Sequence, residues 1–378
     1  MTPVSLLSFH RFAFGLAAVL VILHPFASAG ELIHGRPSVV LQNQTARLVV
    51  DLKGGALGDF RLHGSDLNPL SWAAPGPRDT SIHGFGHFLC LDRWGPPSEA
   101  EGAKGMPYHG EAANVEWTVV DDAARRDGAI AAQMAASLPK AGLSVRRTIR
   151  MSEKEAVFSV REEIRNENAL GRIYNMVQHP TVGPPFLDES TVVDCSGRKG
   201  FAQGGSLPNP EEPSFFWPQA LNADGEAVNL RGLTTTPEPN VVSYSIDAKY
   251  GWVTAATPGK ELLIGYLWAT RDYPWVSLWR DVRDGKPAAR GLEFGTTGLH
   301  QPFPILVQKG RIWDRQLFEY LDSGAATVKS YTVFLLKIPA DFAGVEAVEV
   351  DRGRIVVKER SGGKTREFSV HAEGLISE

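Results

Sequence analysis

The stretch AVFSVREEIRN, residues 156–166, decides the fold class of this 378-residue chain. Phe158, Val160 and Ile164 fall on one side of an extended segment, and charged residues alternate with them on the other side. Successive side chains of a strand point to opposite faces, so the pattern predicts a strand that is buried on one face only.

Similar short segments, rich in Val, Ile, Phe, Tyr and Trp, recur on both sides of this stretch. The 38 glycines and 25 prolines are spread throughout, which fits many strands joined by turns and leaves little room for long helices. Even AAQMAASL, residues 131–138, is too short and too close to strands to form a major helix. We therefore predict an all-β chain with one large antiparallel domain. The other predicted strands are 46–52, 114–120, 143–151, 261–270, 331–338 and 353–360, the last turning back at residues 361–363.

The N-terminal residues carry the pattern of an export signal. Arg11 precedes an apolar run at 12–23, and Ala-Ser-Ala follows at 27–29. These features are typical of a cleaved secretory signal peptide, and the run falls short of the ~20 residues that a bilayer crossing needs. We expect a signal peptide at 1–29, a single domain at 30–378, and an exported, periplasmic or secreted protein with no membrane span. An uncleaved membrane anchor is the alternative.

The net charge bears on the class of partner, and the cysteines bear on a possible disulfide. The net charge of −4 is mild and indicates neither a nucleic-acid nor an anionic membrane partner. Cys90 and Cys195 both lie in the exported part, where an oxidising compartment would permit a disulfide. Because sequence does not fix the distance between them, a disulfide and two free buried thiols both stay open.

Two histidines lie at predicted strand–loop junctions. In GMPYHGEAANVEW, residues 105–117, His109 lies between a proline and a glycine, where the backbone turns. In YNMVQHPTVGPPFLD, residues 174–188, His179 directly precedes Pro180, which favours extended backbone. An imidazole at such a position can exchange a proton near neutral pH. Both histidines could instead be ordinary solvated loop residues.

The segment ARGLEFGTTG, residues 289–298, contains a candidate carboxylate. Leu292 and Phe294 flank Glu293, so a strand here would turn the carboxylate away from its apolar neighbours. The nearby glycines would let a ligand approach closely. A solvent-facing glutamate is the alternative.

Several other residues are weaker candidates for ligand or metal binding. Arg93 could donate to ligand hydroxyls. His83 and His87 are four residues apart but lie between glycines, so the helical spacing that a metal pair would need is not indicated. Three tryptophans offer flat apolar faces of the kind that support a sugar: Trp217, Trp275 and Trp279.

Taken in order, three of these segments resemble the aldose 1-epimerase (galactose mutarotase) family. PYHGEAANVEWTVV, 107–120, is similar to the family's His-Gly segment before a Trp-bearing strand. QHPTVGPPFLD, 178–188, resembles the segment of its second histidine, and GLEFGT, 291–296, resembles its glutamate segment. The agreement extends over residues 40–340. It implies a large twisted antiparallel β-sandwich, the galactose mutarotase-like supersandwich, with an open concave face for a pyranose.

The resemblance also implies site residues. His179 resembles the general acid that protonates the ring oxygen, and Glu293 the base that deprotonates the anomeric hydroxyl. His109 resembles the histidine that binds the sugar, while Arg93 and Asp247 resemble substrate-binding residues. Acid and base on opposite sides of the ring, worth about 10²–10⁴ each, would exchange α and β anomers without metal or cofactor.

Two departures from the family pattern bear on the substrate. Ala113 stands where hexose-phosphate relatives carry an arginine, and Pro180 follows the second histidine. We therefore expect a free sugar or oligosaccharide ligand. The alternatives are a non-catalytic carbohydrate-binding protein on the same fold, and a polysaccharide lyase or hydrolase accessory. Lyases of that kind usually carry a helical domain, for which this chain is too short and too β-rich.

Overall fold

The computed structural model describes most of the chain, and residues 31–378 form one compact unit. The predicted signal peptide and the predicted turn at 361–363 lie outside the described residues. The residues that the structure describes are Met1, 32–33, 35–74, 84–232, 234–360 and 366–376.

The described residues build a first sheet of twelve strands, and all of its strand pairs are antiparallel. β23 (Glu319–Leu321) lies off the main path and pairs with β10. Along that path the order is β1 (Leu32–Ile33), β2 (Arg36–Gln42), β3 (Ala46–Asp51), β4 (Leu57–Leu62), β5 (His87–Asp92), β10 (Arg172–Val182), β20 (Lys286–Gly295), β19 (Trp275–Arg283), β16 (Val241–Ser245), β12 (Lys199–Ala202) and β13 (Ser214–Phe216).

A second antiparallel sheet has eight strands within the described part of the chain. Its order is β11 (Val192–Cys195), β17 (Tyr250–Thr257), β18 (Leu262–Ala269), β24 (Ala326–Lys337), β9 (Val157–Asn166), β8 (Leu143–Ser152), β7 (Ala129–Leu138) and β6 (Thr118–Arg126). In β9 the predicted alternation is confirmed, because Phe158, Val160 and Ile164 are buried whereas Arg161 and Arg165 are exposed. The expectation that residues 131–138 form no major helix holds too, since they lie within β7.

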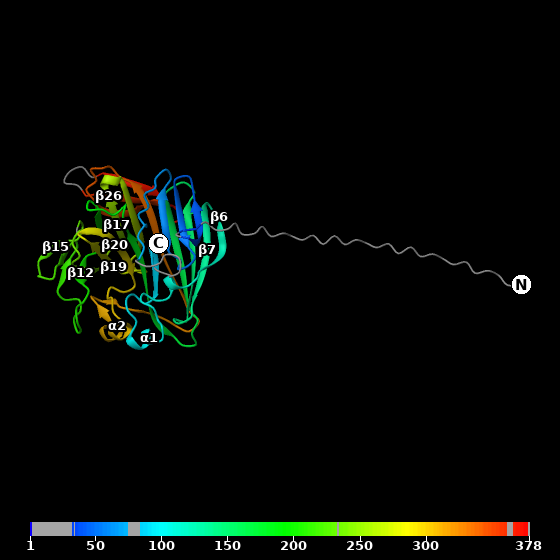
Figure 1. Cartoon of the computed structure of the whole chain (residues 1–378), viewed down its shortest axis with the longest axis horizontal. Helices are drawn as coiled ribbons and strands as arrows, with labels where there is room; N and C mark the ends of the chain where they lie inside the picture. Colours follow the sequence, from blue (N-terminus) through cyan, green and yellow to red (C-terminus); the bar gives the residue numbers. More distant parts are fainter. Residues whose placement is uncertain (2–31, 34, 75–83, 233, 361–365, 377–378) are drawn as a thin grey trace. The chain divides into compact units, whose positions relative to one another are not determined.

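Smaller elements surround the two sheets. A three-stranded sheet, β25 (Val345–Asp351), β26 (Arg354–Glu359) and β27 (Glu367–His371), shares an apolar cluster with β17, β18 and β24. At the end opposite β26, α1 and α2 lie close together (Figure 1). The remaining elements are α1 (Glu99–Ala103), α2 (Phe303–Lys309), the 3₁₀ turns η1 (Ala112–Asn114) and η2 (Pro258–Lys260), and the strand pairs β14 (Gln219–Leu221) with β15 (Ala227–Asn229) and β21 (Arg311–Ile312) with β22 (Arg315–Gln316).

None of the described helices is long and apolar enough to cross a bilayer.

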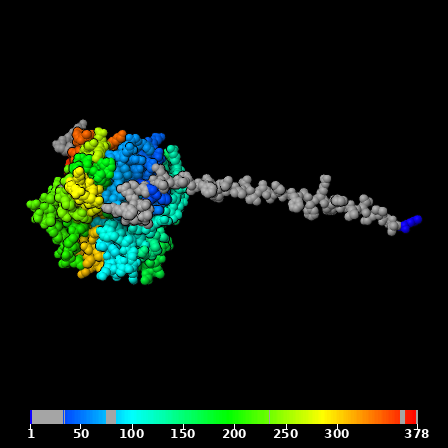
Figure 2. Space-filling model, in the orientation of Figure 1, coloured from blue at the N-terminus to red at the C-terminus, as the bar shows by residue number. Residues whose placement is uncertain are grey.

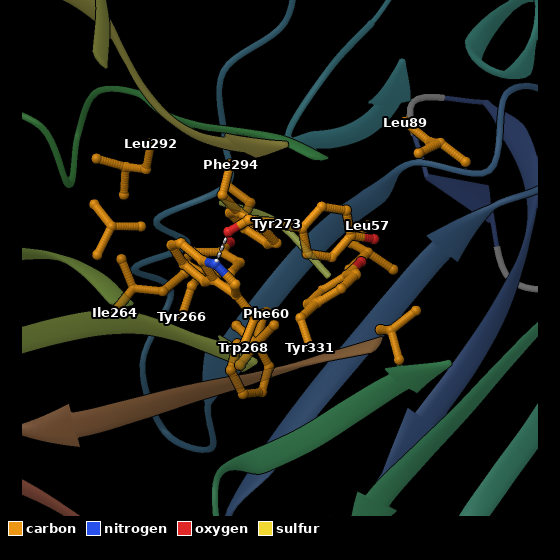
Figure 3. Packing of buried hydrophobic residues seen from close by; sticks show 14 of the residues in the cluster. Leu57, Phe60, Leu89, Ile264, Tyr266, Trp268, Tyr273, Leu292, Phe294 and Tyr331 are labelled. Atoms are coloured by element: carbon orange, nitrogen blue, oxygen red, sulfur yellow. Dashed lines mark hydrogen bonds between the residues drawn. The ribbon is translucent and has the colours of Figure 1, made fainter. Parts of the chain in front are cut away.

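The main core lies between the two large sheets and is rich in aromatic side chains (Figure 3). Phe294 of β20 stacks on Trp268 of β18 with ring centroids 4.1 Å apart and planes within 9°. The Trp268 indole donates to the backbone oxygen of Tyr273 at 2.8 Å. Full burial of one such large apolar side chain contributes about 1.5–3 kcal/mol. This packing fixes which face of β20 points inward, and therefore which face is left for a site.

The two cysteines are free thiols in the structure. Cys90 and Cys195 are both buried, and they belong to different apolar clusters. The sequence left a disulfide open, and the structure resolves the question in favour of two unpaired thiols.

Candidate active site

Antiparallel register brings five side chains into one row across neighbouring strands. Phe88 of β5 pairs with His179 of β10. The flanking pairs of β10 and β20 place His179 level with Glu293. Glu293 pairs with Ser277 of β19, which in turn pairs with Ser243 of β16. Because side chains alternate along each strand, all five share the face of the first sheet that points away from the main core.

The first three members of this row line a cavity of about 710 Å³. That volume falls within the ~300–1,000 Å³ typical of small-molecule sites. Leu292 and Phe294 are buried in the main core on the other side of the sheet, so the predicted outward direction of Glu293 is confirmed.

The Glu293 carboxyl has two close partners. Its Oε2 accepts a hydrogen bond from the indole nitrogen of Trp94 at 2.6 Å. Its Oε1 lies 3.4 Å from Nε2 of His179. Burial disfavours the charged form and raises the pKa of Glu293 to about 8, although the Trp94 hydrogen bond acts in the opposite direction.

His179 is held in a fixed orientation beside the carboxyl. Its ring stacks on Phe88 with centroids 4.2 Å apart, and its Nδ1 lies 3.0 Å from the Thr181 hydroxyl. The other ring nitrogen therefore faces Glu293. Burial lowers the pKa of His179 to about 3. Burial disfavours the charged forms of both groups. At pH 7 the pair therefore favours a neutral His179 imidazole and a protonated Glu293 carboxyl.

This geometry corrects one expectation. An acid and a base on opposite sides of a sugar ring would need a ring's width between them, but His179 and Glu293 are in contact. A separation of 3.4 Å leaves no room for a pyranose between the two groups. Two groups in contact could serve proton transfers at a single carbon, such as the anomeric carbon, which bears both the ring oxygen and a hydroxyl.

His109 occupies a strained turn at the side of the cavity. Its φ is +65°, a left-handed value that is uncommon outside glycine. His109 donates its backbone N–H to the carbonyl of Gly95, and the Gly95 N–H donates to Nδ1 of His109, both at 3.0 Å. Since Nδ1 accepts, the neutral ring carries its proton on Nε2. Burial is the main cause that lowers the pKa of His109 well below its usual range, so the neutral ring is the favoured form.

Glycine is required next to His109. Gly110 has φ +77°, and an added Cβ would lie 2.0 Å from the backbone oxygen of Leu91. The His109-Gly110 pair of the sequence thus forms a tight turn of the backbone. It pins the turn against β5 and carries the imidazole into the cavity lining, where its ring centroid lies 5.3 Å from that of His179.

The structure brings neither predicted substrate-binding residue to the cavity. The buried Arg93 guanidinium is bound by Asp92 at 2.6 Å and by Glu101 at 2.8 Å, so it braces α1 rather than contacting a ligand. Its position over the Phe303 ring ties α1 to α2, and the two lie side by side at one end of the molecule in Figure 2.

Asp247 lies on the surface and is engaged elsewhere. It accepts hydrogen bonds from Arg198 and Arg315, and the pKa of its carboxyl is lowered by these two cations. It is not among the described residues that line the cavity. The resemblance predicted that Asp247 binds the substrate, but the structure places Asp247 outside the described lining of the cavity.

The three candidate tryptophans separate into three environments. Trp279 lines the cavity, and its ring lies 6.0 Å from that of His179. Trp275 is buried in an apolar cluster beside Phe201. Trp217 packs edge-on against Tyr244, away from the site.

Most of the cavity lining was not predicted from sequence, including four ring-bearing side chains: Trp72, Trp94, Tyr108 and His300. The Tyr108 hydroxyl lies 2.9 Å from Nε2 of His300, and the edge of that ring meets Trp94. Burial lowers the pKa of His300 to about 4. The available signal was proximity in sequence for three of them: Trp94 follows Arg93, Tyr108 precedes His109, and His300 comes shortly after the strand of Glu293, whereas Trp72 carries no such signal.

Only one of the two histidines considered as a metal-binding pair lies in the described part of the chain. His83 lies outside the described residues, and His87 points into the core, where its Nε2 lies 3.0 Å from Oε1 of Gln178. In the part of the chain that the structure describes, no group of three or more His, Cys, Asp or Glu is arranged to hold a metal ion.

Comparison with solved structures identifies the fold. A galactose mutarotase-like protein from Clostridium acetobutylicum matches 82% of this chain and 98% of its own at TM-score 0.59 and 13% identity. The galactose mutarotase related enzyme from Lactobacillus acidophilus matches 80% and 98% at TM-score 0.57 and 12% identity. A candidate aldose 1-epimerase from Escherichia coli K12 matches 80% and 99% at TM-score 0.55 and 13% identity.

The sequence itself matches no family model and no curated protein. The likeness therefore lies in the fold, a galactose mutarotase-like antiparallel β-sandwich that confirms the predicted fold class.

Proposed function

We propose that this galactose mutarotase-like chain is an exported aldose 1-epimerase, which interconverts the α and β anomers of a free sugar. One observation carries the proposal: His179 Nε2 and Glu293 Oε1 lie 3.4 Å apart in a cavity of small-molecule size. A proton donor and a proton acceptor in contact are what ring opening at a single carbon requires.

In the proposed reaction the sugar lies with its anomeric carbon over the pair. Ionised Glu293 takes the proton of the anomeric hydroxyl while protonated His179 gives its proton to the ring oxygen. The bond between the anomeric carbon and the ring oxygen breaks, and an aldehyde forms. Rotation about the bond between C1 and C2 turns the other face of the carbonyl toward the hydroxyl, and the reverse proton transfers close the ring as the other anomer.

The electrostatics of the pair support this cycle. Ring opening leaves Glu293 protonated and His179 neutral, which is the form that burial favours. The ion pair is the higher-energy form of these two buried groups, so it transfers its proton readily. His109 presents Nε2–H, which would donate to a sugar hydroxyl and hold the ring over the pair.

Export is part of the proposal and has its own support in the sequence. Residues 1–29 have the basic, apolar and small-residue order of a cleaved leader. Mass spectrometry of the protein recovered from a bacterial periplasm would give a mature chain beginning near residue 30. A full-length chain in the membrane fraction would contradict export by cleavage.

A non-catalytic carbohydrate-binding protein on the same fold is the second candidate. It is favoured by the absence of Arg93 and Asp247 from the cavity, because the resemblance assigned substrate contacts to both. Polarimetry of freshly dissolved α-glucose and α-galactose separates the two candidates. We expect the purified chain to accelerate the approach to anomeric equilibrium in proportion to its concentration. Sugar binding by calorimetry without acceleration would select the binding protein.

A further inference from the structure

The cavity extends along the strands to both sides of the His179–Glu293 pair. On one side, Trp94 follows the end of β5 and His300 follows the end of β20, which run in the same direction. On the other side, Trp279 of β19 pairs with the residue two positions before Glu293. The pair therefore lies near the middle of the cavity, with Trp279 at the end opposite His300.

Trp72 lies at the same end as Trp279. A Cβ built on Gly183, the residue after the end of β10, would lie 2.9 Å from Cβ of Trp72. The Trp72 and Trp279 rings meet edge to face at 5.6 Å, and Trp72 also stacks against Phe88 at 6.5 Å. Both tryptophans are half-buried and line the cavity. They form an aromatic corner of the cavity beside the His179–Glu293 pair.

The cavity is larger than one sugar ring. A hexose displaces about six waters, or roughly 180 Å³ at ~30 Å³ for each. The cavity volume is about 710 Å³. A single hexose over Glu293 would leave space for at least one more ring, and the aromatic corner bounds that space with flat apolar faces of the kind sugars lie against.

The lining selects for an uncharged ligand. Among the described residues that line the cavity, Glu293 is the only Asp, Glu, Lys or Arg. Arg93, which was predicted to contact the substrate, is held by Asp92 and Glu101. A phosphate or carboxylate on the sugar would therefore meet no lysine or arginine in the described lining, only three histidines that burial keeps neutral, and burying an unpaired charge is costly.

We propose that the cavity binds the reducing end of a neutral oligosaccharide. The reducing ring lies over His179 and Glu293, and the next ring lies on the corner formed by Trp72 and Trp279. The position of the reducing ring rests on the proposed epimerase function, whereas the second-ring site rests on the cavity and its tryptophans alone.

The test compares binding of one and two rings to the full mature chain. Titration calorimetry gives dissociation constants for glucose and galactose, and for maltose, cellobiose and lactose. We expect at least one disaccharide to bind at least tenfold more tightly than its reducing-end monosaccharide. We expect Trp72→Ala to lower this ratio at least fivefold, and Trp72→Phe to lower it less. Trp217→Phe removes an indole outside the cavity and should leave the ratio unchanged.

The outcomes separate this inference from the proposed function. A preference for a disaccharide that depends on Trp72, without anomer exchange for any sugar, would refute the epimerase and keep the second-ring site. Exchange of glucose or galactose anomers with no preference for any of the three disaccharides would overturn the second-ring site and keep the epimerase. A preference that is unaffected in a folded Trp72→Phe or Trp72→Ala chain would also overturn it.

Discussion

Replacing Trp94 by phenylalanine isolates the hydrogen bond that tunes the proposed base. The indole of Trp94 is completely enclosed and donates to Glu293 at 2.6 Å. Phenylalanine keeps a ring in the same place and removes the donor. Because the bond stabilises the ionised carboxyl, its loss must raise the pKa of Glu293 above the value of about 8.

The size of the effect follows from the strength of such a bond. A hydrogen bond to a charged group contributes about 1.5–3 kcal/mol, and 1.36 kcal/mol corresponds to one pKa unit. We therefore expect the pKa of Glu293 to rise by about 1–2 units. The reactive form is ionised Glu293 beside protonated His179, with one proton on the pair, so the share of this form, and with it kcat/KM, would fall about 10- to 100-fold at pH 7.

The assay is the pH profile of anomer exchange, followed by NMR exchange spectroscopy between pH 5 and pH 10 and corrected for the uncatalysed rate. Because the pair loses its single proton above the pKa of Glu293, the falling limb near pH 8 should move to higher pH in the variant, and the loss seen at pH 7 should persist at pH 5. Trp275→Phe is the matched control, because Trp275 is equally buried and its indole nitrogen has no hydrogen-bond partner among the described residues. A folded Trp94→Phe chain with an unshifted profile would refute the reasoning.

Three further predictions follow from the same geometry. His109→Asn keeps a residue that tolerates φ +65° but loses the Nε2–H donor, so KM for the sugar should rise about tenfold; an unchanged KM would remove His109 from sugar binding. The pKa of Glu293, about 8 in the fold against an ordinary 4.5, means that the native state binds the extra proton between these values, so stability falls as pH rises through this window. From pH 5 to pH 8, urea denaturation should show Glu293→Gln gaining about 3–4 kcal/mol of stability relative to wild type, and equal differences at both pH values would contradict the raised pKa. Gly110→Ala should lower the free energy of unfolding by about 1–3 kcal/mol, because its Cβ would strike the Leu91 carbonyl at a left-handed φ; wild-type stability would count against that contact.

The fold class was predictable because it depends on local alternation. In residues 156–166 the alternation of apolar and charged side chains predicts which face is buried and which is exposed, and β9 shows the same alternation in the structure. The same reasoning predicted that Glu293 points to the other face of the sheet from Leu292 and Phe294, and the structure agrees. A period of two is a property of a single strand, so it needs no knowledge of the partner strand.

The rest of the site depends on contacts between distant segments. Arg93 has no sequence mark that distinguishes a ligand contact from an ion pair, and its partner Glu101 is fixed only when α1 forms. Trp94 acquires a role because β5 and β20 flank β10 in the same direction, which sequence alone does not reveal. His300 and Trp72 are brought to the cavity by the same long-range register.

The proposed acid–base roles of His179 and Glu293 are tested most directly by the anomer-exchange rates of Glu293→Gln and His179→Gln, compared with the rate of Glu163→Gln. Glu163 lies on β9 in the second sheet, so the third variant makes the same chemical change as the first at a position away from the cavity. We expect the first two variants to fold and to lose at least 100-fold in kcat, since each removes one proton-transfer group, and we expect Glu163→Gln to retain wild-type turnover. Wild-type exchange by a folded Glu293→Gln or His179→Gln chain would contradict these roles.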